Sequence, residues 1–178
     1  MGGWQSTSGS ANKTVNMPLE YNNNDGDTVI IPVDASQQAE AAFLWYVNHV
    51  HRPENTVRIL HCQEVVQSTP MLAEHAFRTD SWVDLMERAR EQGQNIISKY
   101  DKKLEEHNIK GSVIFEVGKP GETVIDAAEK NRATMIVMGT RGFGLVRRTI
   151  LGSVSEYVIH HTKVPVTVVP KETQSWFF

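Results

Sequence analysis

The chain has 178 residues, 40% of them hydrophobic and 22% charged, a composition that suits one soluble domain with a buried core. Its formal net charge of -3 leaves no surplus of basic side chains for a phosphate backbone, which disfavours nucleic acid as a partner. The single cysteine, Cys62, excludes an internal disulfide and suits a reducing cytoplasm, and no apolar run approaches the roughly 20 residues of a membrane span.

The first 27 residues are rich in glycine, serine and asparagine, and their hydrophobic residues are scattered. This composition predicts a flexible N-terminal arm. Gly2 and Ser6 match the pattern for N-myristoylation, but one acyl chain supports only marginal membrane binding. We therefore expect a cytoplasmic protein without stable membrane association.

From residue 28 onward, strand patterns and helix patterns alternate. Residues 28–34 form a β-branched run without polar alternation, typical of a strand buried on both faces. A helix follows, which Ser36 is placed to cap and whose apolar positions recur at helical spacing: Ala39, Ala42, Phe43, Tyr46, Val47 and Val50. Residues 57–63 are the second predicted strand.

The second half of the chain continues this alternation. A longer helix is predicted at about residues 81–107, with an apolar face of Met86, Ala89, Ile97, Tyr100 and Leu104. Strands are predicted at residues 112–117, 134–139 and 164–169. Residues 118–122 form a turn that leads into a short helix with Val124, Ile125 and Ala128, and a further helix is predicted at residues 153–162. The connection at 65–80 is too long for an ordinary loop, which indicates a functional flap or a mobile loop.

Apolar strands alternating with helices imply parallel pairing through right-handed crossovers. We therefore expect an open, doubly wound, Rossmann-like α/β sheet of five parallel strands with helices on both faces. In such sheets, ligands bind beyond the carboxyl ends of the strands.

Glycines follow the fourth predicted strand, where this rule places a ligand. Gly139 and Gly142 allow a sharp turn and a close approach of a ligand, while Gly152 and Ser153 open the next helix, whose N–H groups attract anions. This spacing suits phosphate binding, with residues 143–151 as a loop over the phosphates. The same residues also suit a tight turn and ordinary capping, so both interpretations stay open.

Four motifs in order resemble the ATP-binding branch of the universal stress protein family. They are Pro32-Val33-Asp34, the run from Leu60 to Cys62, Gly139-x2-Gly142-x9-Gly152-Ser153, and Val164-Pro165-Val166. The resemblance covers about residues 28–170, which would be the domain, and leaves 1–27 as the arm and 171–178 as a tail.

The resemblance implies a strand order of 3-2-1-4-5 and a role for each matched residue. Asp34 would meet the ribose and a possible magnesium ion, Pro32 and Val33 would line the adenine side, and Cys62, at the end of the second strand, would contact adenine through its backbone. The ribose and phosphate wall would consist of Met138, Gly139, Arg141, Gly142, Gly152, Ser153, Val154 and Ser155.

Other roles compete for some of these residues. A carboxylate such as Asp34 at a strand end often caps the following helix. Cys62 has no cysteine partner, which favours an inert or backbone-contact role over redox chemistry. The histidine pairs 49/51 and 160/161 lack the spacing that puts two metal ligands on one helix face, which disfavours a transition-metal site.

The expected function is that of a nucleotide-dependent sensor or binding protein in the stress response, which binds ATP, or AMP or ADP, with Mg²⁺ as an ion that would accompany the nucleotide. No histidine or glutamate is placed as a base beside a γ-phosphate, so we expect at most slow hydrolysis. One alternative is a nucleotide-independent dimeric scaffold, since the resemblance implies a homodimer through the apolar strand at 164–169. Another is a related adenine-nucleotide hydrolase.

Overall fold

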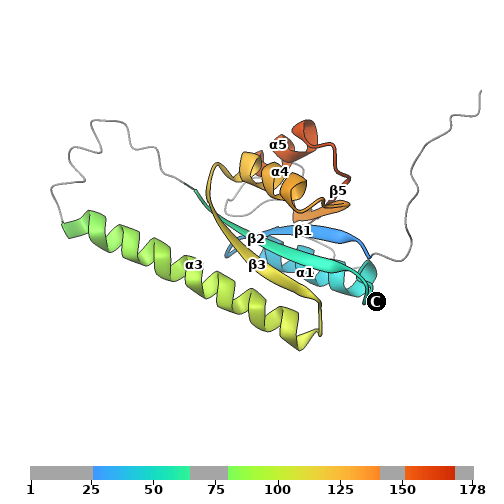
Figure 1. Ribbon diagram of the computed structural model, residues 1–178. Helices are drawn as coiled ribbons and strands as arrows, with labels where there is room; N and C mark the ends of the chain where they lie inside the picture. The colour runs from blue at the N-terminus through green and yellow to red at the C-terminus, as the bar shows by residue number, and fades with distance from the viewer. Residues whose placement is uncertain (1–25, 65–79, 141–150, 171–178) are drawn as a thin grey trace, which may run out of the picture.

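The computed structural model describes residues 26–64, 80–140 and 151–170 of the chain (Figure 1). Several predictions lie outside these residues: the arm before residue 26, the connection at 65–79, the glycine loop at 141–150 with Arg141 and Gly142, and the tail after residue 170.

The described strands form one parallel sheet in the order β3-β2-β1-β4-β5. This finding confirms the doubly wound fold and the strand order 3-2-1-4-5. The strands are β1 (Thr28–Val33), β2 (Thr56–Glu64), β3 (Gly111–Gly118), β4 (Met135–Gly139) and β5 (Val166–Val169).

Helices connect these strands and cover both faces of the sheet (Figure 1). On one face lie α1 (Gln37–His49) and α3 (Asp80–Glu106), and on the other lie α4 (Pro120–Lys130) and α5 (Ser153–His161). Among the described residues, none of the helices is long and apolar enough to cross a membrane.

The core beneath α1 and α3 is built around aromatic side chains. Phe43, Tyr46 and Tyr100 are fully buried there, and the rings of Phe43 and Tyr100 pack edge to face with centroids 5.7 Å apart. The sequence prediction placed Ile97 on the buried face of α3, but the structure buries Ile96 and leaves Ile97 half-buried. Ile96 lies four residues before Tyr100, so both side chains project onto the same helical stripe.

The core beneath α4 and α5 is aliphatic. It contains Ile30, Leu60, Val124, Ile136 and Met138. Because Leu60, Val124 and Met138 also line a pocket at the carboxyl ends of the strands, this core continues into the wall of that pocket.

The last strand begins later than predicted. β5 starts at Val166 rather than at Val164. Pro165 has no N–H to donate, and its carbonyl accepts a hydrogen bond from the N–H of Ile136 at 2.9 Å. β5 pairs with β4 and forms one edge of the sheet.

Candidate functional site

A pocket of about 630 Å³ opens at the carboxyl edge of the sheet, where β1 and β4 are neighbours. Its volume lies within the range of roughly 300–1,000 Å³ that is usual for small-molecule sites. All the residues predicted for the site line this pocket except Arg141 and Gly142, which lie outside the described residues: Pro32, Val33, Asp34, Cys62, Met138, Gly139, Gly152, Ser153, Val154 and Ser155.

The carboxylate of Asp34 is held by the turn between β1 and α1. One of its oxygens, Oδ1, accepts hydrogen bonds from the backbone N–H of Ser36 at 2.9 Å and from the Ser36 hydroxyl. The hydroxyl of Ser36 in turn accepts the N–H of Ala39 at 3.2 Å, so Ser36 caps α1, as its position predicted. The competing interpretation of Asp34 as the helix cap is wrong, because Ser36 has that role.

Gly139 has a packing reason to be a glycine. A Cβ atom built at this position would lie 2.7 Å from the carbonyl oxygen of Gln38, in the first turn of α1. The lack of a side chain at 139 therefore lets α1 pack close to the end of β4. This contact explains Gly139 without reference to a ligand, although the residue also lines the pocket.

The start of α5 faces the pocket without a capping side chain. Gly152 is the N-cap residue and provides no side-chain hydrogen bond to the helix. Its N–H donates to the carbonyl of Thr140 at 2.6 Å, which joins the start of α5 to the end of β4. The first-turn N–H groups of a helix carry partial positive charge, so this helix end can attract an anion.

Ser155 is buried and its hydroxyl contacts the backbone. The hydroxyl lies 2.9 Å from the carbonyl of Gly152 and 3.2 Å from that of Thr140, and it donates to both. One proton shared between two carbonyls fixes this side chain in the turn. Ser153, by contrast, is exposed in the first turn of α5, so its hydroxyl is the more accessible of the two.

Cys62 lies within β2 and not at its end, because the strand continues to Glu64. The pairing of β2 with β1 stops at His61, whereas its pairing with β3 continues past Cys62. From Cys62 onward, the side of β2 that faced β1 has no strand partner among the described residues, which leaves this backbone edge for another contact. Burial raises the pKa of the Cys62 thiol, which lies 3.6 Å from the carbonyl oxygen of Gly118.

The described part of the pocket wall is acidic. Asp34, Glu64 and Glu156 line it, and no lysine or arginine is among its described residues. Three carboxylates lower the affinity for a polyphosphate unless a cation offsets their charge.

The pocket includes residues that the sequence did not identify. Pro120 and Val124 enter it from α4, and Gln38 and Ala39 enter it from α1. The apolar positions of α4 were recognised as a buried face, but their spacing does not show that this face reaches the edge of the sheet. Which helix ends reach the pocket depends on strand order, which the resemblance implied and the periodicity alone did not.

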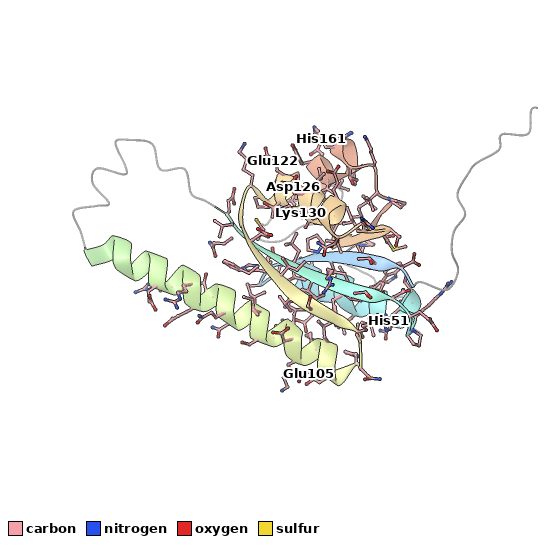
Figure 2. All side chains as sticks on the ribbon, in the orientation of Figure 1. His51, Glu105, Glu122, Asp126, Lys130 and His161 are labelled. Carbon is pink, nitrogen blue, oxygen red and sulfur yellow. The ribbon has the colours of Figure 1, made fainter. Side chains whose placement is uncertain are left out.

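The histidines of the described residues do not form a cluster. His51 lies by the end of α1 and His161 at the end of α5, far apart in the molecule (Figure 2). The Nδ1 atoms of His49 and His161 each lie within 2.8 Å of a carbonyl oxygen one turn earlier in their own helices. Within the described ranges, no three His, Cys, Asp or Glu residues come together as a metal site.

Comparison with known proteins identifies relatives over almost the same part of the chain. A model of the universal stress protein family matches residues 26–170. Universal stress protein MJ0531 of Methanocaldococcus jannaschii is 32% identical over 143 residues, which are 80% of this chain and 81% of that protein.

Solved structures match the fold. The hypothetical protein MJ0577 of Methanocaldococcus jannaschii is 26% identical with a TM-score of 0.65, over 82% of this chain and 96% of that one. A universal stress protein family protein of Arabidopsis thaliana, solved with AMP bound, is 16% identical with a TM-score of 0.58, over 83% of this chain and 94% of that one.

Proposed function

Because the chain belongs to the universal stress protein family, we propose that it binds an adenine nucleotide in the pocket at the carboxyl edge of its sheet. The observation that carries this proposal is the gathering of the predicted residues from four different strands and helices, β1, β2, β4 and α5, around one pocket of suitable volume. The AMP-bound Arabidopsis protein supports an adenine nucleotide as a ligand of this fold.

The pocket offers a different chemistry for each part of the nucleotide. Pro32, Val33 and the unpaired edge of β2 at Cys62 would receive the adenine ring, since apolar side chains and free backbone groups suit a flat heteroaromatic base. The carboxylate of Asp34 would accept hydrogen bonds from the ribose hydroxyls. The uncapped start of α5, with Gly152, Ser153 and Val154, would hold phosphate.

Magnesium would complement the acidic wall. Mg²⁺ commonly binds through one or two carboxylates together with the phosphates of a nucleotide. Asp34 lines this wall and would face an ion held mainly by the phosphates, with water molecules between the ion and its carboxylate. We expect ATP to bind more tightly with Mg²⁺ than without it, whereas a nucleoside without phosphates would be insensitive to the ion.

The single cysteine provides a direct test of where the nucleotide binds. Cys62 lines the pocket, so a bound nucleotide should shield its thiol from N-ethylmaleimide. With ATP at about a hundred times its dissociation constant, about 1% of the protein remains free, so the alkylation rate should fall by up to about a hundredfold. Because the thiol pKa is raised, the experiment is best run above neutral pH, where more thiolate is present.

Thermal unfolding of the full chain gives an independent measure. The same ATP concentration should stabilise the fold by about 2.7 kcal/mol, or roughly 5 to 11 °C in Tm for a domain of this size. GTP is the control for the base, and Asp34→Ala is the control for the site. Protection of Cys62 and a Tm shift with ATP but not with GTP would support the proposal.

The nucleotide's role would be that of a signal rather than a substrate. Among the described pocket residues no histidine is available as a general base, so the site favours binding over rapid phosphoryl transfer. We expect slow hydrolysis at most. Bound nucleotide would alter the surface around the pocket that partners recognise.

A dimeric scaffold that acts without nucleotide is the second candidate. The observation that favours it is β5, an apolar edge strand whose residues Val166, Thr167 and Val168 are only half-buried. Sedimentation of the full chain measures the oligomeric state. A dimer in which no nucleotide protects Cys62 or changes Tm would replace the sensor proposal with the scaffold.

A further inference from the structure

The turn from β1 to α1 contains a directed chain of hydrogen bonds. The N–H of Ala39 donates to the hydroxyl of Ser36, and that hydroxyl donates its only proton to Oδ1 of Asp34. The backbone N–H of Ser36 donates to the same oxygen at 2.9 Å. Ser36 is 5% exposed, so this arrangement is shielded from water.

These bonds make the two oxygens of Asp34 different. Oδ1 receives two hydrogen bonds, which occupy the lone pairs that it has available for strong bonds. Oδ2 receives none from the described residues, and Asp34 lines the pocket. Because Oδ1 accepts hydrogen bonds from both the backbone and the side chain of Ser36, rotation of the carboxylate is restricted.

We propose that Ser36 is a positioning residue: by holding Oδ1 of Asp34, it presents Oδ2 to the hydroxyl groups of the ribose, so that the pocket discriminates ribose from a sugar without hydroxyls. This inference rests on the proposed adenine-nucleotide site, and it assigns sugar selectivity to a residue that would not itself touch the ligand.

Few side chains can make both hydrogen bonds that Ser36 makes. The residue must accept a hydrogen bond from α1 and donate one to Asp34 through the same atom. Serine and threonine hydroxyls do both, whereas an aspartate accepts only and would repel Asp34. Glycine keeps the backbone N–H and is tolerated at helix N-caps, but it lacks the hydroxyl.

The test compares dissociation constants for ATP and for 2′,3′-dideoxy-ATP, measured calorimetrically with the full chain. Wild-type protein should prefer ATP by about ten- to a hundredfold, the usual effect of a hydrogen bond to a charged group. Ser36→Gly should reduce this preference to about threefold or less, because only the backbone N–H at position 36 then bonds Oδ1, and the carboxylate can rotate about that single bond. The affinity of the Ser36→Gly variant for 2′,3′-dideoxy-ATP should stay within about twofold of the wild-type affinity.

Two further variants separate positioning from a structural role. Ser36→Ala removes the hydroxyl and weakens the helix cap, so it should lower Tm more than Ser36→Gly while losing the same sugar preference. Ser36→Thr retains the hydroxyl and should restore the preference. A purely structural role would change the affinity for both nucleotides equally and leave their ratio at the wild-type value.

The outcomes distinguish the two proposals. If wild-type protein binds neither nucleotide, the proposed function fails, and this inference fails with it. If wild-type protein binds both nucleotides equally well, the nucleotide site stands and the inference is overturned. An unchanged ratio in folded Ser36→Gly, or a folded Ser36→Thr that does not restore the preference, also overturns it.

Discussion

Helices α1 and α5 both begin at the pocket, but only α1 has a side chain that caps its first turn. The hydroxyl of Ser36 accepts the N–H of Ala39, whereas Gly152, at the start of α5, offers no side chain. A capped helix start stabilises the fold, and an uncapped one keeps its N–H groups available for an anion. The two helix starts at one pocket therefore differ in availability: Ser36 at the start of α1 is bonded to both Asp34 and Ala39, whereas the start of α5 keeps the N–H groups to which we assign the proposed phosphate.

The largest expected effect comes from displacing α1. We expect Gly139→Ala to destabilise the fold by about 3 kcal/mol, the upper part of the usual range for overpacking. The added Cβ would lie 2.7 Å from the Gln38 carbonyl oxygen, so backbone must shift. Urea unfolding measures this change.

Gly93→Ala in α3 is the matched control for Gly139→Ala. Its Cβ would lie 3.3 Å from a ring carbon of Phe115, a side chain that can adjust. Alanine also gains roughly 1 kcal/mol in helix propensity over glycine. We expect a near-neutral effect, and equal destabilisation by the two variants would contradict the packing role of Gly139.

A side-chain cap at the start of α5 should have the next largest effect. Gly152→Asp should raise the stability of the nucleotide-free protein by a few tenths of a kcal/mol, as an aspartate N-cap does relative to glycine. It should also remove most of the about 2.7 kcal/mol by which ATP at a hundred times its dissociation constant stabilises the wild type. The added carboxylate would occupy the same N–H groups and repel phosphate. Thermal unfolding with and without Mg-ATP measures both effects.

Gly152→Ala is the control for this experiment, because it adds a Cβ without a capping group. Alanine is a poor N-cap, so this variant should be less stable than the wild type by up to about 1 kcal/mol while keeping most of the ATP response. Full retention of the ATP response in Gly152→Asp would show that the anion does not bind at the start of α5.

The smallest expected effect comes from the acidic residue in the first turn of each helix, Glu40 in α1 and Glu156 in α5. Glu40 of α1 forms ion pairs with two lysines of α3, Lys99 at 2.6 Å and Lys103 at 2.9 Å. Hydrogen bonds from Lys103, which has the larger effect, and from Lys99 lower the pKa of the Glu40 carboxyl below its ordinary value. Glu156 of α5 is exposed. Both carboxylates gain from their helix dipoles, so the difference between Glu40→Gln and Glu156→Gln isolates the contact between α1 and α3.

We expect this difference to be under about 1 kcal/mol at pH 7, because Glu40 is one-third exposed and solvent screens the pair. A lowered pKa in the folded state means that the stabilisation is present above the unfolded value near 4.5 and is lost as the pH falls through the folded value. Urea unfolding at pH 7 and at about pH 3 measures it. A difference that persists at the lower pH would argue against the ion pairs as its source.

The fold was predictable from sequence because its signals are local. Runs without polar alternation such as that of β1, and helical spacing such as that of Phe43 and Tyr46, depend on neighbours within one element. Ser36 was correctly predicted as the cap of α1 for the same reason. The choice of Ile97 over Ile96 was wrong because both isoleucines fit the periodicity, and only the angle at which α3 packs on the sheet separates them.

The site was predictable as a set of residues but not as a set of contacts. The site residues that the family resemblance named line the pocket wherever the structure describes them. The packing reason for Gly139 is the carbonyl of Gln38, about a hundred residues earlier in the chain. The bonds from Ser36 to Asp34 likewise depend on the path of a three-residue turn. The prediction of such contacts requires a three-dimensional structure, because the spacing of residues in the sequence does not determine the direction of their side chains.

The close contact between α4 and α5 has a mechanical consequence. A Cβ at Gly121 of α4 would lie 2.5 Å from the ring of Tyr157 of α5, so the ring packs directly on the α4 backbone and the two helices interlock. Pro120 and Gly152, at the starts of these helices, both line the pocket, so this helix contact sets the spacing of one part of its wall. Any displacement of α4 would therefore be transmitted through this contact to the start of α5.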